Sequence, residues 1–418
     1  MQLHNYASNH AKTFGAILLF ICVFIIIVLR RPDIILNAQP WAEDGTLWMA
    51  NIYNDSLLTS LISSENGYFQ TISRLAYGIG LFFGISNAAL ISNIIAISIR
   101  CFFVLFLLSD RMRLIDIFYR IAVVIYFIFM PNLAEGYVNI TNAQWYLALY
   151  LLSVIIADSP DTKLWKVHDF AVLILSALSG PFIVFIAVCQ ALKRISQHGS
   201  ILEALKKMDA FDIIIGICTC IQTVAILSSF SSERSSAPLG ASIGLLANII
   251  SYRIIGGTFF ANDSIITIGQ QNILNLVLFF VLSFTVVVLF IRFGWRVRVA
   301  ILFPLLLISF ALAKPMMSTE GPQWPLFLSG GGERYFFITN FAFFCMIVFI
   351  ISRIKAGKFI IGILIVAMIP SFISYFRIAA MPEVGYRRDI ATFKSLPSGE
   401  TMDIRINPPG WKMTLIKK

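Results

Sequence analysis

The sequence predicts an all-α fold, a polytopic bundle of transmembrane helices, and three observations support this prediction. Of the 418 residues, 58% are hydrophobic and only 13% are charged, whereas a soluble chain carries roughly 25% charged residues. The hydrophobic residues form long runs rather than the short alternating segments of a membrane β-barrel. The Lys and Arg residues mostly lie in short loops between these runs. Because only helices and closed barrels satisfy their backbone groups in lipid, the runs are expected to be helices.

About eleven runs are expected to cross the membrane. The first, residues 14–29, follows Lys12 and resembles the apolar part of a signal peptide. However, Leu36-Asn37-Ala38 is a poor cleavage site and more apolar runs follow, so we expect a retained helix. The other expected crossings are residues 88–108, 117–131, 143–157, 169–178, 181–192, 211–229, 272–291, 299–312, 335–352 and 358–376.

The basic loops set the expected orientation. They cover residues 111–113, 163–166, 193–207, 292–298 and 353–358, and the positive-inside rule assigns them to the cytoplasm. The outer side then holds loops 31–87, 132–142, 230–271 and 313–334 together with the tail. We therefore expect a transmembrane bundle over residues 1–376, with a first outer loop over 31–87, and an outer tail over 377–418. The loop 230–271 is expected to lack regular structure.

Two segments leave alternatives open. Residues 69–84 are apolar enough to cross, but a crossing there would reverse every later loop, so we expect an interfacial or re-entrant helix. At Ser179-Gly180-Pro181 the helical pattern breaks, and such a break either borders a cavity or forms a plain loop.

Charge and cysteine usage exclude several classes of protein. The net charge is +10, but no soluble element carries a basic face interleaved with aromatic residues, so nucleic-acid binding is not expected. All six cysteines lie inside apolar runs, and the four histidines lack ligand spacing. Neither a disulfide framework nor a zinc site is therefore expected.

The outer loops carry compact clusters of carboxylates, amides, aromatic residues and glycine. In chain order these clusters cover residues 41–45, 65–68 with Arg74, 135–145 and 331–335. Aromatic rings offer flat faces to sugars, and amides and carboxylates pair with hydroxyl groups. We therefore expect one shared sugar or acceptor site, contacted by Trp41, Tyr68, Glu135, Asn142, Gln144, Trp145, Glu333 and Tyr335. The simpler alternative is an interfacial aromatic belt with helix caps.

Glu43 and Asp44 form an acidic pair just after the first crossing. Adjacent carboxylates repel each other, and next to lipid one of them is expected to have a raised pKa and to accept a proton from a hydroxyl nucleophile. We expect the pair to be catalytic, with either member as the base. The alternatives are a solvated loop or a helix cap, since Gly and Thr follow Asp44.

Cations on the same face are candidates for a lipid phosphate. Arg334 follows three glycines and precedes a crossing, and its guanidinium suits bidentate phosphate binding. Arg74 is a second candidate, and Arg253 and Lys314 are weaker ones. The alternative roles for Arg334 are an interfacial anchor or an internal pair with Glu333.

These features together resemble the GT-C superfamily of integral-membrane glycosyltransferases. The segment Trp41-Ala42-Glu43-Asp44-Gly45, the Gly67-Tyr68…Arg74 element, the Pro131…Glu135…Asn142…Trp145 stretch and Arg334-Tyr335 look like a bacterial and phage branch. Length and tail are similar to the type-specific glucosyltransferases of O-antigen serotype conversion. The resemblance covers most of the chain, although each motif is short.

The resemblance implies an activity and a location. The donor would be an undecaprenyl-phosphate sugar, with glucose as the expected sugar, and the acceptor a hydroxyl of a lipid-linked O-antigen repeat. Transfer would occur at the periplasmic face of a bacterial inner membrane. Family members use a first-loop carboxylate as general base, which corresponds here to Glu43 or Asp44, and they usually invert the anomeric centre. Some relatives use a divalent cation, which the pair would bind weakly, but we expect transfer without a metal or other cofactor.

Rival functions follow from other features. Transporters and flippases of lipid-linked sugars place charges inside their crossings, whereas these runs are nearly free of charge. An O-antigen polymerase would rely on arginines and histidines in a large outer loop, but 230–271 contains no histidine. The tail ends in a turn-rich segment with Trp411, which either docks over the site to hold the acceptor or packs on the bundle.

Overall fold

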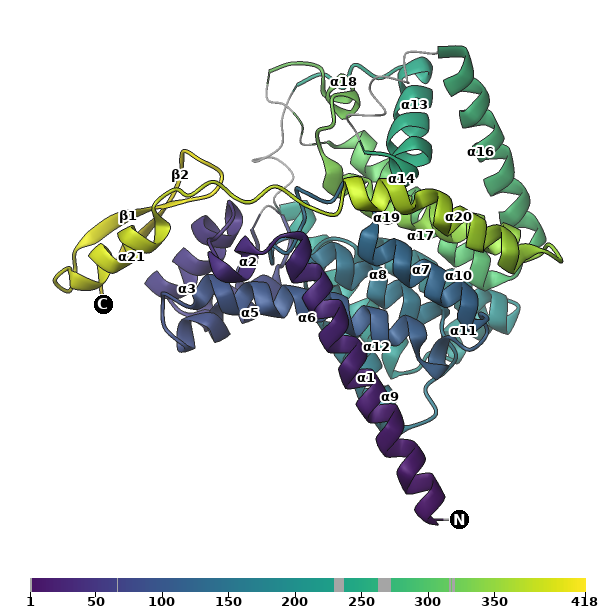
Figure 1. Ribbon diagram of the computed structural model, residues 1–418, viewed down its shortest axis with the longest axis horizontal. Helices are drawn as coiled ribbons and strands as arrows, with labels where there is room; N and C mark the ends of the chain where they lie inside the picture. Colours follow the sequence, from purple (N-terminus) through teal and green to yellow (C-terminus); the bar gives the residue numbers. More distant parts are fainter. Residues whose placement is uncertain (1, 66, 229–236, 262–271, 316, 318–319) are drawn as a thin grey trace.

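The structure is a computed structural model that describes residues 2–65, 67–228, 237–261, 272–315, 317 and 320–418, with side chains from residue 13 onward. Within these ranges the chain is mostly helical (Figure 1). In this described part of the chain, seven helical segments are long and apolar enough to cross a membrane, and the chain is therefore a helical membrane protein. They are α1 (Gln2–Arg30), α6 (Ala88–Leu108), α12 (Ala210–Ser228), α16 (Asn272–Arg292), α17 (Trp295–Ala313), α19 (Phe337–Ile351) together with the preceding 3₁₀-helix η4 (Glu333–Tyr335), and α20 (Gly357–Ser374).

Four of the expected crossings correspond to shorter helices. These are α7 (Ile117–Phe129), α8 (Ala143–Ile156), α9 (Lys163–Ala177) and α10 (Ile183–His198). Each of these is shorter than the minimum of about 17 residues that a crossing helix needs. The number of crossings therefore stays a prediction.

The break between α9 and α10 lies where the sequence predicts it. Gly180 has a φ of +114°, a conformation that side chains rarely adopt. A Cβ at this position would lie 2.1 Å from Gln144 Oε1. The backbone of this segment bonds to the first outer loop, since Gly180 N–H donates to Phe69 O at 2.8 Å and Thr71 N–H to Leu178 O at 2.9 Å. The break is thus part of the polar end of the bundle.

The first outer loop is built from short helices. They are α2 (Asp33–Leu36), the π-helix η1 (Asp44–Met49), α3 (Ala50–Asn54), α4 (Leu57–Ile62) and α5 (Thr71–Phe82). Helix α5 has only 12 residues and turns back onto α6, where a Cβ on Gly80 would lie 2.7 Å from Ala88 O. The helix expected over 69–84 is therefore present and too short to span, while its depth in the membrane stays a prediction.

The expectation that 230–271 lacks regular structure is wrong for its described part. Residues 243–259 form α13 (Ile243–Ile249), the π-helix η3 (Ile250–Gly256) and α14 (Gly257–Phe259). Ser251 Oγ donates to Asn275 O of α16 at 2.9 Å, and Arg253 is buried and donates to Phe327 O at 2.8 Å. The glycines and Arg253 made this segment look like a solvated loop in the sequence. In the structure Arg253 is instead buried, and tertiary contacts rather than water satisfy its guanidinium.

The expectation of an all-α fold is wrong for the tail. After α21 (Tyr386–Ser395), strands β1 (Thr401–Ile406) and β2 (Trp411–Ile416) form an antiparallel hairpin in which Ile406 faces Trp411. Alternate residues of the strands are buried, as expected for a two-sided strand. The connection Asn407-Pro408-Pro409-Gly410 provides the turn, with Gly410 at a φ of +94°.

The tail docks on the first outer loop rather than forming a separate unit (Figure 1). Asn54 Nδ2 donates to Thr414 O at 2.9 Å, and its Oδ1 accepts from Ile416 N–H at 3.0 Å. The Tyr53 and Phe393 rings lie 5.7 Å apart. The buried apolar side chains of the tail belong to the same hydrophobic cluster as those of the helices. Tail and first loop therefore lie at the same end of the bundle.

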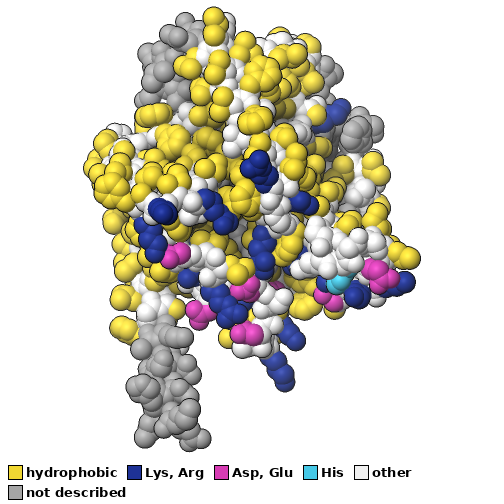
Figure 2. Space-filling view, turned by 90° about the vertical axis from the view of Figure 1, so that its right-hand side faces the viewer, with side chains coloured by type: hydrophobic (Ala, Val, Ile, Leu, Met, Phe, Trp, Pro, Cys, Tyr) yellow, Lys and Arg dark blue, Asp and Glu magenta, His cyan; other side chains and the backbone are white. Residues whose placement is uncertain are grey.

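The basic loops lie together at a different end of the bundle, as the positive-inside rule requires. Figure 2 views the side that lies at the right of Figure 1, and Lys and Arg side chains lie there among apolar surface. Ion pairs join loops that are far apart in sequence, since Arg296 lies 3.3 Å from Asp158 and Lys358 lies 2.8 Å from Asp116. These loops therefore share one side of the bundle, and its assignment to the cytoplasm stays a prediction.

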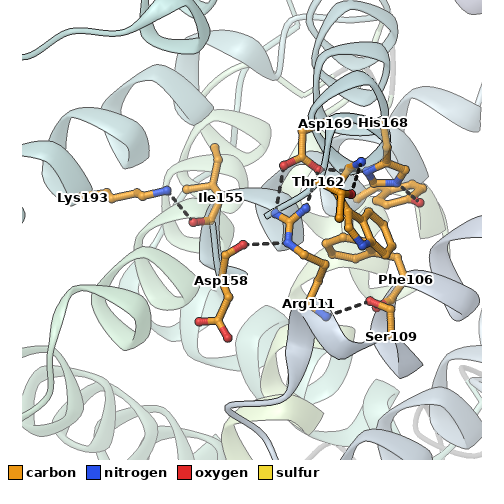
Figure 3. Close-up of polar contacts among 11 residues, drawn as sticks. Phe106, Ser109, Arg111, Ile155, Asp158, Thr162, His168, Asp169 and Lys193 are labelled. Carbon is orange, nitrogen blue, oxygen red and sulfur yellow. Dashed lines mark hydrogen bonds and ion pairs between the residues drawn. The ribbon is translucent and has the colours of Figure 1, made fainter. Parts of the chain in front are cut away.

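A buried polar cluster holds this basic end together (Figure 3). Arg111 donates to both carboxylate oxygens of Asp169, at 3.1 and 2.9 Å, and its Nε donates to Asp158 O at 2.7 Å. His168 Nδ1 lies 2.9 Å from Asp169 Oδ1, and its Nε2 lies 2.7 Å from Tyr150 Oη. The cluster connects the loop after α6 to α8 and α9.

Candidate functional site

The predicted polar clusters of the outer loops meet at the end of the bundle that carries the first loop. Asp44 is bonded to Thr141, and Glu135 is bonded to both Glu333 and Arg334. The Trp145 and Tyr335 rings lie 6.0 Å apart with their planes at 86°. Segments 41–45, 135–145 and 331–335 thus form one continuous polar region.

Asp44 is held by two hydrogen bonds from one residue. It is 2% exposed, and its Oδ1 accepts from Thr141 N–H at 3.0 Å and from Thr141 Oγ1 at 2.6 Å. The Thr141 hydroxyl in turn accepts from Trp48 Nε1 at 2.7 Å. Burial raises the pKa of Asp44 to about 7, against the opposing effect of the Thr141 bonds. The carboxyl therefore titrates near neutral pH and fixes the 135–145 segment to the first loop.

Glu43 has a different environment from its neighbour. It is half-buried and precedes η1, where its side chain makes no capping hydrogen bond. Among the described residues no hydrogen bond or ion pair engages its carboxylate, although its charge acts on Asp44, Tyr68 and Arg334. The helix-cap alternative therefore has no support at Glu43, and its carboxylate is available to a ligand.

Arg334 pairs with Glu135, not with Glu333. Its Nη1 donates to Glu135 Oε1, and its backbone N–H donates to Glu135 Oε2 at 3.2 Å. Glu333 Oε2 accepts from the backbone N–H of Glu135 at 3.1 Å. Gly332 has a φ of +66° and allows the tight turn that precedes this contact. The Arg334 side chain keeps 33% of its surface exposed, so it is reachable by an anion.

A small pocket lies beside this ion pair. Its cavity volume is only about 10 Å³, and it is lined by Asn132, Leu133, Gly136, Asn142, Trp145, Tyr146, Glu333, Arg334 and Phe337. Four of these residues, Asn142, Trp145, Glu333 and Arg334, are predicted site residues. The indole N–H of Trp145 is buried and has no hydrogen-bond partner in the described chain. A buried donor without a partner is costly unless a water or a ligand accepts from it, so this N–H is a candidate ligand contact.

The remaining predicted residues do not line this pocket. Gln144 is buried against Gly180, its Oε1 without a partner among the described residues. Tyr68 lies next to Gln144 and Gln70. Trp41 lies on the side of the tail, where it bridges to Asn407.

Arg74 is a buried cation rather than a surface one. It has no exposed surface, its guanidinium lies 5.1 Å from the Trp48 ring, and its Nη1 donates to Ser63 O. Burial lowers its pKa. Its Nε and Nη2 have no partner within the described residues. Phosphate binding by Arg74 would require these surroundings to open, and that role stays a prediction.

The sequence reasoning missed Arg100. This residue lies within α6, is 4% exposed, and has its guanidinium 4.0 Å from the Tyr146 ring and 4.8 Å from the Tyr137 ring. Its Nη2 donates to Gly136 O at 2.8 Å, and no ion pair among the described residues engages it. Because charges inside crossings are rare and usually functional, the lone arginine within 88–108 was the signal that could have found it. It contacts Gly136 and Tyr146, which line the pocket.

No group of three His, Cys, Asp or Glu side chains that could hold a metal ion occurs in the described part of the chain. The polar region formed by segments 41–45, 135–145 and 331–335 contains carboxylates, amides, aromatic rings and a guanidinium group. Such a set can bind a phosphate, stack on a sugar and accept a proton.

No protein-family model, no curated protein and no solved structure matches this chain. The likeness to GT-C glycosyltransferases therefore rests on the motifs alone.

Proposed function

We propose that this protein is a GT-C-type glycosyltransferase that uses a polyprenyl-phosphate sugar. The sugar, in the first instance glucose from undecaprenyl-phosphate glucose, passes to a lipid-linked O-antigen repeat at the periplasmic face of a bacterial inner membrane. The observation that carries the proposal is the Glu43 carboxylate, which has no hydrogen-bond or ion-pair partner among the described residues and whose charge acts on Arg334. Arg334 in turn lines a pocket that contains the unsatisfied indole N–H of Trp145.

The chemistry is a single displacement. Glu43 takes the proton of the acceptor hydroxyl while that oxygen forms a bond to the anomeric carbon. The bond from the anomeric carbon to the lipid phosphate breaks, and its electron pair leaves with the phosphate. Arg334 stabilises the charge that develops on the phosphate, and Arg100 adds positive potential from below the pocket. We assign the base to Glu43 because its carboxylate has no partner among the described residues, whereas one oxygen of Asp44 is held by Thr141.

The pocket must widen to take a sugar. Its cavity volume of about 10 Å³ lies far below the roughly 300–1,000 Å³ of typical ligand sites. We infer that the donor phosphate replaces the Glu135 carboxylate on Arg334, since both are anions and the guanidinium can donate two hydrogen bonds to either. Glu135 is then released to bond sugar hydroxyls, which is the role the sequence predicts for it.

The test compares the two carboxylates. Membranes that contain Glu43→Gln or Asp44→Asn would be assayed for transfer of labelled glucose from undecaprenyl-phosphate glucose to lipid-linked O-antigen. We expect Glu43→Gln to lower the rate by about 10²–10⁴-fold, the usual contribution of general-base catalysis. Asp44→Asn keeps an oxygen for Thr141 and is expected to lose much less activity.

Arg334→Ala is expected to raise the KM for the donor and lower the rate, and Arg353→Ala at the basic end serves as the matched control. Wild-type transfer rates in Glu43→Gln at normal expression would refute Glu43 as the base. Equal losses of transfer rate in Glu43→Gln and Asp44→Asn would show that the two carboxylates act together as the base.

One observation favours a second candidate, a transporter or flippase of lipid-linked sugars. Arg100 is a buried charge within a crossing, the arrangement that transporters use. Proteoliposomes that contain the protein and a fluorescent lipid-linked sugar would separate the two functions. Movement of the lipid across the bilayer without transfer, lost in Arg100→Gln, would support the transporter.

A further inference from the structure

A groove lies at the surface where the tail meets the first outer loop. It is lined by Asn37 of the loop and by tail residues from α21, β1, β2 and their connections, namely Glu383, Val384, Gly385, Arg387, Arg388, Arg405, Ile406, Pro409, Gly410, Trp411 and Lys412. Four of these side chains are cationic and one is anionic, so the groove has an excess of positive charge. An anionic ligand therefore fits it better than a neutral or cationic one.

Some of these cations are already engaged. Arg405 donates to both oxygens of Asp389, at 2.8 and 2.6 Å, and Arg387 Nη2 donates to Leu36 O at 2.6 Å. The anion Glu383 accepts from Asn37 Nδ2 at 2.6 Å. These contacts shape the groove and hold α21 against the first loop.

Two cations stay available. The guanidinium of Arg388 is exposed and makes no hydrogen bond or ion pair within the described residues. Lys412 Nζ lies 3.7 Å from Asp403, but both side chains are more than half exposed. Exposed pairs of this kind hold each other weakly, so Lys412 is free to turn to a ligand.

An aromatic platform lies beside these cations. Trp411 is 44% exposed and begins β2 directly after the turn at Gly410. Its backbone is fixed by pairing with Ile406. An exposed indole on a paired strand is a face on which a sugar ring can stack, because its apolar body is accessible and its N–H makes no hydrogen bond within the described residues.

The groove connects directly to the segment that carries the acidic pair. Asn407 O accepts from Ala42 N–H at 2.5 Å, and Asn407 N–H donates to Pro40 O at 3.2 Å. The Ile406 side chain packs against Gly45, where a Cβ would lie 2.6 Å from its Cδ1. A ligand in the groove would therefore be held next to the loop of Glu43 and Asp44.

We propose that this groove binds the phosphate-bearing saccharide head of the lipid-linked acceptor. The sugar stacks on Trp411, and Arg388 and Lys412 bind the phosphate. That this ligand is the acceptor of a sugar transfer rests on the function proposed above. The binding of a phosphorylated saccharide to the groove does not depend on that function. The groove thereby acts as a second subsite, separate from the pocket at Arg334.

Binding would be measured on the full chain in phosphatidylcholine nanodiscs. The probe is farnesyl diphosphate N-acetylglucosamine, a water-soluble short-chain lipid-linked sugar, and farnesyl diphosphate is the sugar-free comparison. We expect Arg388→Ala and Lys412→Ala each to weaken binding of both compounds by about tenfold, as for the loss of a charge-assisted hydrogen bond. Trp411→Ala should weaken only the sugar-bearing probe. Lys394→Ala, on α21 but outside the groove lining, is the matched control, and unfolding temperatures check that each variant is folded.

Several outcomes would overturn the proposal. Wild-type binding by both Arg388→Ala and Lys412→Ala, or no binding by the wild type, excludes a phosphate subsite. An equal effect of Trp411→Ala on the two compounds excludes the sugar contact. Loss of probe binding when phosphatidylglycerol is added to the nanodiscs would assign the groove to bulk lipid headgroups instead.

The same variants separate this inference from the proposed function. Glu43→Gln should bind the probe like the wild type, because binding needs no turnover. In the transfer assay Arg388→Ala should raise the KM for the acceptor by about tenfold and leave kcat unchanged. Probe binding through the groove without any transfer by the wild type would refute the transferase and leave the saccharide site in place.

Discussion

Two adjacent carboxylates have opposite roles at the residue scale. Asp44 points into the protein and is bonded twice by Thr141, while Glu43 stays half-buried without a described partner. Their order in the sequence does not distinguish them, because consecutive residues at a helix start differ in direction and in burial. Only the packing of the 135–145 segment on η1 decides which carboxylate is structural and which is available.

The raised pKa of Asp44 makes stability depend on pH. Its pKa is about 7 in the folded protein, against 3.8 for an unperturbed Asp, so the folded state holds the proton more tightly. Stability from this group is fully present below about pH 4 and declines as the pH rises to about 7. Asp44→Asn removes the titration, so its unfolding temperature relative to the wild type should rise over this range and level off above it. A difference that does not vary between pH 4 and pH 8 would contradict the burial of a titrating Asp44.

The buried Arg111–Asp169 pair gives a second prediction at this scale. Asp169→Ala leaves the Arg111 guanidinium, 4% exposed, without its bidentate partner. Removal of one partner of a buried pair costs about 3–5 kcal/mol, so the unfolding temperature should fall sharply in a thermal-shift measurement by size-exclusion chromatography. Glu203→Ala, which breaks the exposed pair with Lys206, is the control and should change stability by less than about 1 kcal/mol. Similar effects of both variants would show that the cluster is not a structural clamp.

At the scale of secondary-structure elements, the C-terminal hairpin and the first outer loop stabilise each other. Ile404 and Ile406 of β1 and Met413 and Leu415 of β2 are buried in the common core, and the Asn407 backbone pairs with residues 40–42. A hairpin of this size is marginal by itself, so docking on η1 and α3 stabilises it. In return it fixes the backbone from which Glu43 and Asp44 project.

Gly45 allows this contact to be tested. In Gly45→Ala the new Cβ would lie 2.6 Å from Ile406 Cδ1 and 3.2 Å from Pro40 Cβ, so the hairpin must shift. Overpacking of this kind typically costs about 1–3 kcal/mol, and transfer should fall together with stability. Ile406→Val removes Cδ1 and should restore part of both in the double variant. Gly244→Ala, where the space is open, should be neutral, and a neutral Gly45→Ala would contradict the docking.

At the scale of the whole molecule, the chain separates its charges between two ends. The basic loops pair with one another at one end, whereas the first loop, the 135–145 segment and the tail meet at another. The helices between them present many large apolar side chains at the surface, which suits lipid rather than water. The proposed site therefore lies at a membrane face rather than inside the bundle.

The orientation of these ends can be measured by cysteine labelling. In a background without the six native cysteines, Glu400→Cys in the tail and Lys206→Cys in the basic end would be exposed to a membrane-impermeant maleimide; both positions are exposed. We expect Glu400→Cys to react in spheroplasts and Lys206→Cys only after the membrane is permeabilised, because basic loops stay in the cytoplasm. The reverse pattern would move the proposed site to the cytoplasmic face.

The sequence by itself determined that the chain is a helical membrane protein, because apolar length and composition alone decide whether a helix can cross lipid. It also determined which loops share an end and that the break at Gly180 separates two helices. It did not determine the helix over 243–259, whose Arg253 is satisfied only by tertiary contacts, or the hairpin, whose short strands need the first loop as a partner. Only the tertiary structure decided that Arg334 pairs with Glu135, that Arg74 is buried, and that Arg100 lies beside the pocket. Such pairings join residues far apart in the chain, and local patterns carry no information about which distant side chains will meet.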